Sequence, residues 1–480
     1  MRELLSYRDL RHLRLVEILN LQREMIQLKE ISKMLDVPIR TIHSDIRNLN
    51  YYIAPFFILT TSAGVILEIP ENYSIRYIYK KILENSLEFR LLQYVFLNEE
   101  KTIKELSKEF FISESTIKRL IKRINKILIK ENIEISTSPV NMTGNERKIT
   151  QFMSSYYNEL YFQFDFVSVE ERKLIEKLVQ SVFDDEKIEL HFNQLKKYTT
   201  WIYVNLVRMK NGHYADVVTN RFANASVLED EDFCQKFSQV FTVELNEGNL
   251  NRLLYARSRA GFISSYQELV KVNYDNKKQA ELTKNVETVL NKITADLCIP
   301  FTSDARESLL LDIVNLINVR GYITFILYDK REYFLKRLSD NYRHVRELVQ
   351  SYIDRLVVPP FDNIEINELT YILLTHLPDL FDRLRYIEKK VVIAILVDSD
   401  LEHAYFIKKE LDSYSRFNIE TKILMGFDLE QVHALTKKQI LVTNIPGITN
   451  VACRVLCFAD YFSSRNWSQL NEQITCILNA

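Results

Sequence analysis

Apolar positions between residues 28 and 50 follow a helical period twice, with a short break between the two runs. In LKEISKMLDVPIRTIHSDIRNLN, residues 28–50, Ile31 and Leu35 share one face of a first helix. Ile42 and Ile46 share one face of a second helix. Two short helices joined by a tight turn form a helix-turn-helix, whose second helix lies in the major groove of DNA.

The same pattern recurs 75 residues later, in IKELSKEFFISESTIKRLIKRIN, residues 103–125. The residues identical at this offset are Lys29/Lys104, Glu30/Glu105, Ser32/Ser107, Lys33/Lys108, Thr41/Thr116, Ile42/Ile117, Ile46/Ile121 and Asn50/Asn125. Pro38 suits the start of a helix, and Ser113 suits an N-cap, which supports a second helix in each copy. The alternative is a pair of ordinary helical hairpins packed in a core.

Two short strands are predicted after each copy, and they argue against that alternative. Phe56–Pro70 reads as two strands around Gly64, and Ile133–Gly144 repeats the arrangement. A tight turn explains both glycines, since glycine adopts backbone conformations closed to other residues. A two-stranded wing after a helix-turn-helix makes a winged helix, so the sequence predicts two winged helices in tandem.

The second predicted recognition helix carries a basic stripe. Lys118, Lys122 and Lys126 fall on one face, with no acidic residue before Lys130. In most helices such a stripe is a solvated face, but here it lies on the element expected to enter DNA. The predicted DNA contacts are Arg40, Thr41, His43, Ser44, Arg47, Ser115, Thr116, Lys118, Arg119, Lys122 and Arg123. Asp45 is expected to be a local salt-bridge or capping partner.

In the rest of the chain the pattern of predicted secondary structure changes once. Residues from about 149 to 388 are helical in pattern, and two parts of this stretch resemble each other: WIYVNLVR from Trp201 resembles IVNLINVR from Ile313. After Lys389, strands alternate with helices, which predicts a small parallel α/β domain. The fold class is therefore mainly α and multidomain. The predicted domains are winged helices at 1–72 and 73–150, helical domains at 151–284 and 285–388, and an α/β domain at 389–480.

Charge and composition narrow the functions that remain. The net charge is −1, but residues 1–150 carry 24 Lys and Arg against 19 Asp and Glu, which leaves +5 there and −6 in the remainder. A basic amino-terminal third suits contact with phosphates. The chain has 8 glycines and none of the common phosphate-loop, nucleophile-elbow or zinc-protease motifs, so no enzyme, cofactor or metal site is predicted.

Cysteine usage and hydropathy bear on the compartment. The five cysteines are scattered, which predicts buried free thiols in a reducing environment. No signal-like segment opens the sequence, and the longest apolar runs, such as Val391–Val397, are too short to cross a bilayer. A cytoplasmic protein without a membrane partner is expected.

This order of parts resembles the Mga/AtxA family, transcriptional regulators of Gram-positive bacteria built around PTS regulation domains (PRDs). The resemblance implies binding to double-stranded DNA near promoters, activation of transcription and a homodimer formed largely through the C-terminal domain. It also implies modulation by histidine phosphorylation, with a phosphocarrier of the sugar phosphotransferase system (PTS) as partner. His376, in ELTYILLTHLPDL, matches the helix that bears the phosphorylated histidine, and Arg257 takes the corresponding place in the first repeat.

The last domain resembles the EIIB component of the same system, which carries phosphate on a cysteine after its first strand. Here that loop, residues 397–403, reads VDSDLEH and has no cysteine. The alternatives to a Mga-type regulator are a phosphotransfer component, a PRD-containing sugar-operon regulator and an RNA-binding antiterminator. The missing cysteine opposes the first of these, and the winged helices oppose the last.

Overall fold

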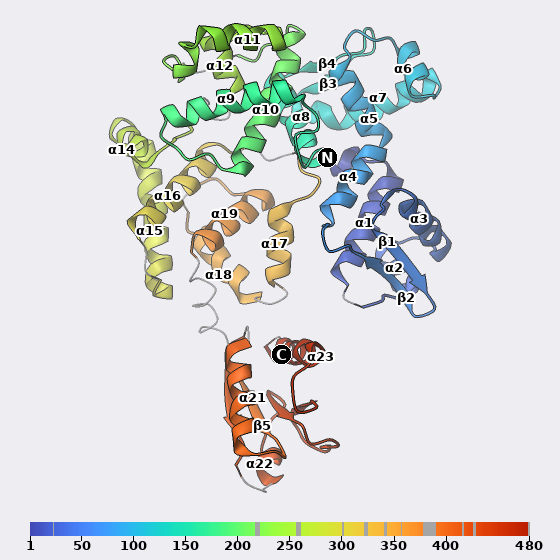
Figure 1. The fold of residues 1–480 in the computed structure, drawn as a ribbon, viewed down its shortest axis with the longest axis vertical. Coiled ribbons are helices and arrows are strands. Elements are labelled where there is room, and N and C mark those ends of the chain that lie inside the picture. Colours follow the sequence, from blue (N-terminus) through green and yellow to red (C-terminus); the bar gives the residue numbers. More distant parts are fainter. Residues whose placement is uncertain are drawn as a thin grey trace. The chain divides into compact units, whose positions relative to one another are not determined.

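The computed structural model describes residues 1–480 except for 23, 217–220, 256–260, 300–301, 321–324, 340–342, 357, 378–389, 415–416, 426–428 and 479–480. The chain divides into two compact units (Figure 1). Unit 1 holds Met1–Phe262 and Val319–Asp329, and unit 2 holds Ile263–Asn318 and Lys330–Ala480. The described residues are mainly helical, and the paired strands that they form lie in two hairpins and one four-stranded sheet.

Two winged helices open unit 1, which confirms the tandem arrangement predicted from the repeat. The first consists of η1 (Arg2–Leu4), α1 (Tyr7–Leu21), α2 (Leu28–Leu35), α3 (Ile39–Tyr52), β1 (Phe57–Thr61) and β2 (Gly64–Glu68). After α4 (Arg76–Asn85), the second consists of α5 (Leu87–Leu97), α6 (Ile103–Glu109), α7 (Glu114–Leu128), η2 (Ile129–Glu131), β3 (Ile133–Ile135) and β4 (Met142–Gly144). Each strand pair is antiparallel.

The residues shared by the two copies build the same turn. The Ser32 hydroxyl donates to the Val37 carbonyl at 2.6 Å, and the Ser107 hydroxyl donates to the Ile112 carbonyl at 2.5 Å. Both turns pass through one left-handed residue, Asp36 with φ 52° and Phe111 with φ 54°. The serine hydroxyls therefore close the turn between the two helices, which explains why they are identical in the two copies.

The wing glycines have a different role from the one predicted. Gly64 begins β2, and Gly144 ends β4, so neither lies at the tip of its hairpin. A Cβ atom on Gly64 would lie 2.7 Å from the Ile26 carbonyl oxygen, and one on Gly144 would lie 2.1 Å from that of Asn132. The tight-turn prediction is wrong: glycine is needed because another backbone segment packs directly against each strand.

One hydrophobic core runs through both winged helices. It continues into α8 (Glu146–Leu160) and includes Leu4, Leu15, Ile117 and Tyr156. Segment 325–328 of the same chain also packs into it, with Phe325 and Leu327 buried. We call residues 325–328 the strap. The strap enters unit 1 although the helices before and after it belong to unit 2.

The remainder of unit 1 is a helical domain with its own core. Its elements are α9 (Val169–Asp185), α10 (Phe192–Lys210), η3 (Ser226–Leu228), α11 (Glu231–Phe241) and α12 (Glu247–Leu253). Ile175, Leu178, Phe237 and Leu250 are fully buried in this core.

Unit 2 begins with a second helical core. Its elements are α14 (Tyr266–Asp275), α15 (Lys277–Leu297), α16 (Ser303–Asn318), α17 (Lys330–Ser339), α18 (Arg343–Ile353) and α19 (Asn363–His376). The predicted domain boundary between residues 284 and 285 falls inside α15, and Val286 and Leu290 of that helix are buried in this core.

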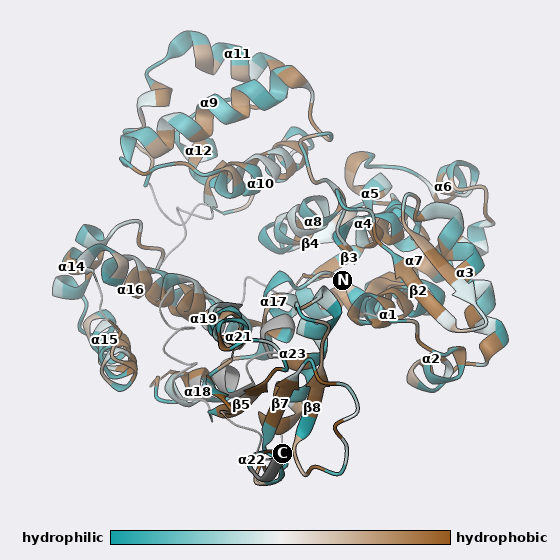
Figure 2. Cartoon of the chain, turned by 60° about the horizontal axis from the view of Figure 1, so that its bottom comes forward, coloured by the Kyte–Doolittle hydropathy of each residue, from teal (hydrophilic) through white to brown (hydrophobic). Residues whose placement is uncertain are grey.

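A parallel sheet ends unit 2, as the alternating pattern predicts. Its elements are β5 (Val391–Leu396), α21 (Leu401–Tyr414), β6 (Ile419–Ile423), α22 (Leu429–His433), β7 (Gln439–Thr443), β8 (Arg454–Cys457) and α23 (Ser464–Leu478). The strand order is β6-β5-β7-β8, all parallel. Apolar residues dominate β5 and β7 at its centre (Figure 2).

The cysteine prediction is only half right. All five thiols are free, but Cys298, Cys457 and Cys476 are exposed and only Cys453 is buried.

Candidate nucleic-acid interface

The predicted contact residues of α3 and α7 occupy the same positions in the two modules. Arg40, His43, Ser44 and Arg47 are exposed on α3. Moving each forward by 75 residues gives the exposed residues Ser115, Lys118, Arg119 and Lys122 of α7. Thr41 and Thr116 also correspond, and both are half-buried. Each module therefore presents one polar helix face built from equivalent positions.

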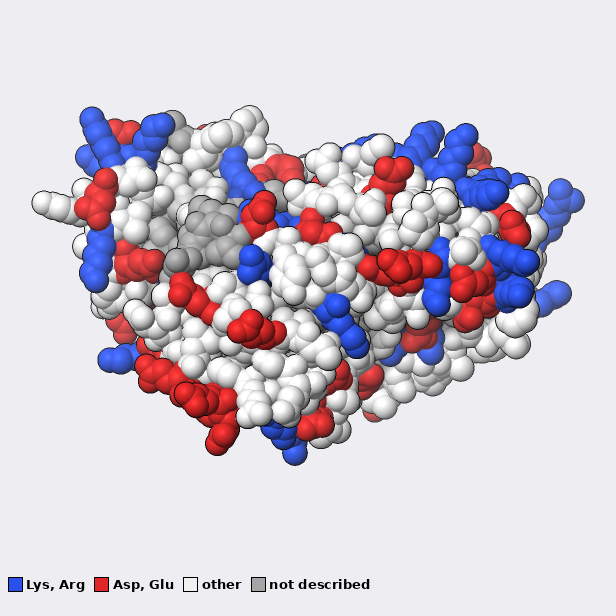
Figure 3. All heavy atoms as spheres, turned by 90° about the horizontal axis from the view of Figure 1, so that it is seen from above, with Lys and Arg blue, Asp and Glu red and all other residues white. Residues whose placement is uncertain are grey.

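Most of the cations on these faces are not neutralised. Among the described residues, no ion-pair partner is found for Arg40, Arg47, Lys118, Arg119 or Lys122. Lys and Arg side chains gather on the right-hand side in Figure 3, the side on which α3 and α6 lie in Figure 1. Uncompensated cations on a helix face attract phosphates and release their counterions.

The hydroxyl groups at the start of α7 are used for capping. The Ser113 hydroxyl accepts from the Thr116 backbone N–H at 3.2 Å, as the N-cap prediction requires. It also lies 2.9 Å from the Ser115 hydroxyl and 2.8 Å from that of Thr116. Ser115 and Thr116 therefore organise the first turn of α7, and Ser115 remains exposed there.

Arg123 differs from its neighbours on α7. Its guanidinium forms an ion pair with Glu88 of α5, whose side chain is only 5% exposed. It also donates to the Leu4 carbonyl at 3.4 Å. The sequence grouped Arg123 with the basic stripe, and it is exposed, but one side of its guanidinium is bound within the protein.

Asp45 lies on the buried face of α3 in a polar network, as its predicted role as a salt-bridge partner implies. Arg11 donates to its two oxygens at 2.5 and 2.8 Å, and His12 lies 3.1 Å away. Burial alone would raise the pKa of Asp45, but the hydrogen bonds from Arg11 and His12 outweigh it and lower the pKa. In the second module, Leu120 stands at the equivalent position.

Each recognition helix is tied to its own wing by one asparagine. The Asn50 amide accepts from the Ile58 N–H at 2.8 Å and donates to the Ile58 carbonyl at 3.0 Å. Asn125 makes the same pair with Ile135, at 2.8 and 2.9 Å. These contacts explain the Asn50/Asn125 identity and set the position of the wing relative to the helix.

Arg208 joins the second wing to the helical domain of unit 1. It is 1% exposed and donates to Glu146 at 2.8 and 2.6 Å and to Glu99 at 2.6 Å. It also donates to the carbonyl of Met142 in β4 at 3.0 Å. His213 lies 2.9 Å from Glu99. In the sequence Arg208 is only the last residue of the run WIYVNLVR, so its role was missed.

His376, the predicted phosphorylation site, is the last residue of α19. Its Nδ1 lies 2.9 Å from the Ile372 carbonyl oxygen, and its Nε2 lies 3.1 Å from Asp312. The hydrogen bond to Asp312 raises the pKa of His376, and burial opposes this rise. The side chain is 27% exposed. Arg257, the corresponding residue in the first repeat, lies outside the described residues.

The loop after β5 is occupied by contacts within the domain. Ser399 lies 2.9 Å from His403 Nδ1, and His403 Nε2 donates to the Asp460 carbonyl at 2.7 Å. Asn444, which follows β7, donates to Asp398 at 2.7 Å. These side chains meet at the carboxyl ends of β5, β7 and β8, and none of them is a thiol.

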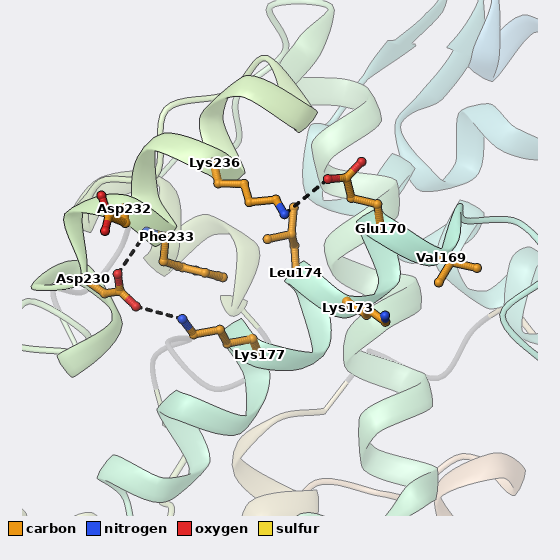
Figure 4. Close-up of a pocket in the computed structure, with 9 residues that line it drawn as sticks. All are labelled: Val169, Glu170, Lys173, Leu174, Lys177, Asp230, Asp232, Phe233 and Lys236. Atoms are coloured by element: carbon orange, nitrogen blue, oxygen red, sulfur yellow. Dashed lines mark hydrogen bonds and ion pairs between the residues drawn. The ribbon is translucent and has the colours of Figure 1, made fainter.

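A groove between α9 and α11 has a volume of about 650 Å³ (Figure 4). The groove is lined by Val169, Glu170, Lys173, Leu174, Lys177, Asp230, Asp232, Phe233 and Lys236. Lys177 pairs with Asp230 at 2.8 Å, and Lys236 pairs with Glu170 at 3.4 Å. Carboxylates therefore offset most of its lysines, and the groove lacks the excess positive charge of a phosphate site.

The two polar recognition helices, each followed by a wing, define a winged helix-turn-helix protein. The Mga helix-turn-helix domain matches residues 71–157, which span α4 to α8. A provisionally named trans-acting regulator of Streptococcus pneumoniae serotype 4 is 23% identical over 477 residues, 94% of each chain. The anthrax toxin expression trans-acting positive regulator of Bacillus anthracis is 20% identical over 382 residues, 75% of this chain and 77% of that protein.

A further relative matches a smaller part. The capsule synthesis positive regulator AcpA of Bacillus anthracis is 25% identical over 209 residues, 42% of this chain and 43% of that protein. The Mga domain match and these relatives support the assignment of the chain to the Mga/AtxA-type regulators of Gram-positive bacteria. Within the described part of the chain, no helix has both the length and the apolar character needed to span a bilayer.

Proposed function

We propose that the protein is a DNA-binding activator of transcription that works in the cytoplasm as a homodimer, without chemistry of its own. The observation that carries this proposal is the repetition of one exposed polar face, with unpaired cations, on α3 and α7. Relatives named as positive regulators support the sign of regulation. The loop at 397–403 without a thiol argues against a phosphotransfer component.

A binding titration against salt tests the DNA contact. Each lost phosphate contact lowers the log–log salt slope by about 0.9. Replacing Lys118, Arg119 and Lys122 with Ala should therefore weaken binding and flatten the slope by up to about 2.7. The matched control replaces Lys277, Lys278 and Lys284, exposed lysines of α15, and should leave both quantities unchanged. An unaltered slope in the α7 variant would show that its face is merely solvated.

The dimer contact is proposed to lie largely in the C-terminal domain. Leu401, Tyr405 and Phe406 of α21 and the neighbouring Tyr461 are 44–60% exposed, and the Phe406 and Tyr461 rings lie 6.2 Å apart. Exposed aromatic clusters of this kind are typical of protein interfaces. Light scattering of Phe406→Glu and Tyr461→Glu variants should report monomers. Dimers of unchanged stability would place the interface elsewhere.

His376 is proposed as the phosphorylated residue, with a PTS phosphocarrier as donor. Its partly exposed ring next to Asp312 supports this role, because a carboxylate orients an imidazole for transfer. Phosphate would add about two negative charges beside Asp312 and should break their contact. His376→Asp and His376→Ala should then have opposite effects on promoter output. Equal effects, with no phosphohistidine detected in cells, would leave His376 as a packing residue.

A further inference from the structure

We propose that α3 and α7 are held as one rigid DNA-reading body. The partner of one protomer is then a single duplex that carries two contact elements at one fixed spacing. This inference rests on the DNA-binding role proposed above and adds the form of the DNA site. Three sets of contacts support it: the join between the modules, the first five residues and the shared core.

The connection between the modules ends in a helix that is packed against both. The helices α4 and α5 are separated by one residue, Ser86, which is fully buried. Along α4, Ile78, Tyr79, Ile82 and Leu83 are buried in the core that both modules share. A flexible linker would be exposed and rich in glycine or serine, and its modules would move independently. Here α4 and Ser86 are part of the packed interior, and residues 71–74 before α4 are exposed.

Residues 2–5 lie between the modules and bind both. Arg2 pairs with Glu17 of α1 at 2.5 Å, and Tyr79 of α4 also donates to Glu17. On the other side, the Leu4 carbonyl accepts from Arg123 of α7 at 3.4 Å. Lys130, just beyond α7, pairs with Glu3 at 3.4 Å. One short segment therefore links the recognition helix of the second module to the first helix of the first module.

The shared core makes independent rotation costly. Leu4 and Leu5 are 2% and 5% exposed, and they pack in the same cluster as Ile42 of α3 and Ile117 of α7. Separating the modules would expose these side chains to water, and the hydrophobic effect opposes such exposure. The angle between α3 and α7 is thus fixed by packing rather than chosen by the DNA.

The arrangement suits one duplex. In both ribbon views α3 and α7 lie toward the same side of unit 1 (Figures 1 and 2). Major-groove helices require their sites in a set helical phase, about 10 base pairs per turn. A rigid pair of recognition helices cannot change its spacing to match a site that contains extra base pairs. Five extra base pairs turn one element to the opposite face, and ten restore the face but lengthen the site by about 34 Å.

Footprinting with the full-length protein tests the spacing. Protection lost in an Arg40, His43 and Arg47→Ala variant marks the α3 element, and protection lost in the Lys118, Arg119 and Lys122→Ala variant marks the α7 element. Insertions of five and ten base pairs are then placed between the two elements of one protomer. Both insertions should lower affinity at least tenfold. Full recovery with ten base pairs, or the finding of only one element, would overturn the inference.

A measurement without DNA separates this inference from the DNA-binding proposal. Spin labels carried by unnatural amino acids at Ser44 and Arg119, which are equivalent exposed positions, leave the native cysteines intact. Dilution with unlabelled protein removes distances between protomers. A single narrow distance distribution is expected for the free protein. A broad distribution would show independent modules even if DNA binds, and a narrow one would stand even if DNA binding failed.

Discussion

Asn125 and Ile135 are joined by two hydrogen bonds, so the end of α7 and the start of the second wing form one piece. The amide accepts at 2.8 Å and donates at 2.9 Å, and both partners are backbone groups of Ile135. No other residue type of this size offers a donor and an acceptor in that arrangement. The wing is therefore positioned by the helix rather than by its own short strands.

Replacing Asn125 with Ala should lower the free energy of unfolding by about 2 kcal/mol, since each hydrogen bond contributes about 1 kcal/mol. Denaturant titration measures the change. Asn50→Ala should match it in the first module, while Asn48→Ala, which changes an exposed side chain of α3, should cost less than about 0.5 kcal/mol. Equal costs for Asn48 and Asn125 would contradict a positioning role.

Arg123 should act on stability as well as on DNA. Arg123→Ala leaves Glu88 buried without its cation, and about 1–2 kcal/mol of stability should be lost, less than for a fully buried pair because the arginine is partly exposed. Adding Glu88→Gln should restore most of the loss. The double variant then isolates the DNA contact: a salt slope smaller by about 0.9 would show that Arg123 also binds phosphate. Lys122→Ala is the control with no stability cost expected.

The strap should make stability depend on pH. Glu159 accepts from the Leu327 N–H at 2.7 Å and from the Tyr328 N–H at 3.0 Å. Burial raises the pKa of Glu159 from 4.5 to about 7, against these hydrogen bonds, which lower it. The folded state therefore binds more protons between about pH 4.5 and pH 7, and stability falls as the pH rises through this window.

Glu159→Gln tests this dependence, because glutamine can still accept from the strap without carrying a charge. The variant should be more stable than the original protein at pH 8, by up to about 3 kcal/mol, and similar to it at pH 5. Denaturation midpoints at the two pH values measure the effect. Glu281→Gln, an exposed residue of α15, is the control. Parallel pH profiles for Glu159→Gln and the original protein would refute the assignment.

The contribution of Asp45 to stability should depend on pH in the opposite direction. Its pKa is lowered in the folded state, so its contribution to stability is present above its unfolded pKa and is lost as the pH falls through the folded one. Asp45→Asn should cost about 2 kcal/mol at pH 7, because Arg11 loses its anion. The cost should disappear in acid. Arg11→Met, His12→Phe and Asp45→Leu together should recover stability, since the second module has Leu120 at this position.

The local parts of this structure could be predicted from the sequence, and the long-range ones could not. Period and turn residues identified both winged helices, and the repeat showed that Asn50 and Asn125 are equivalent, although not that each binds its wing. Arg208 and Glu99 are 109 residues apart, and Glu159 and Leu327 are 168 apart. No periodicity relates residues at such separations. The contacts of Arg208 with the second wing and those of the strap with Glu159 therefore could not be predicted. Arg123 was grouped with the stripe because its partner, Glu88, lies 35 residues away and outside the helix-turn-helix pattern.

The position of the strap in the chain has a consequence for synthesis. Its residues complete the core around α4 and α8, yet 263–318 are translated between that core and the strap. A ribosome therefore releases both winged helices while the pocket for Phe325 and Leu327 is still empty, and Glu159 has no strap N–H to bind. Nascent chains stalled before residue 325 should bind chaperones or be cleaved by protease more readily than chains stalled well beyond it. The amino-terminal unit is thus finished only after the first segment of the second unit, Ile263–Asn318, has been made.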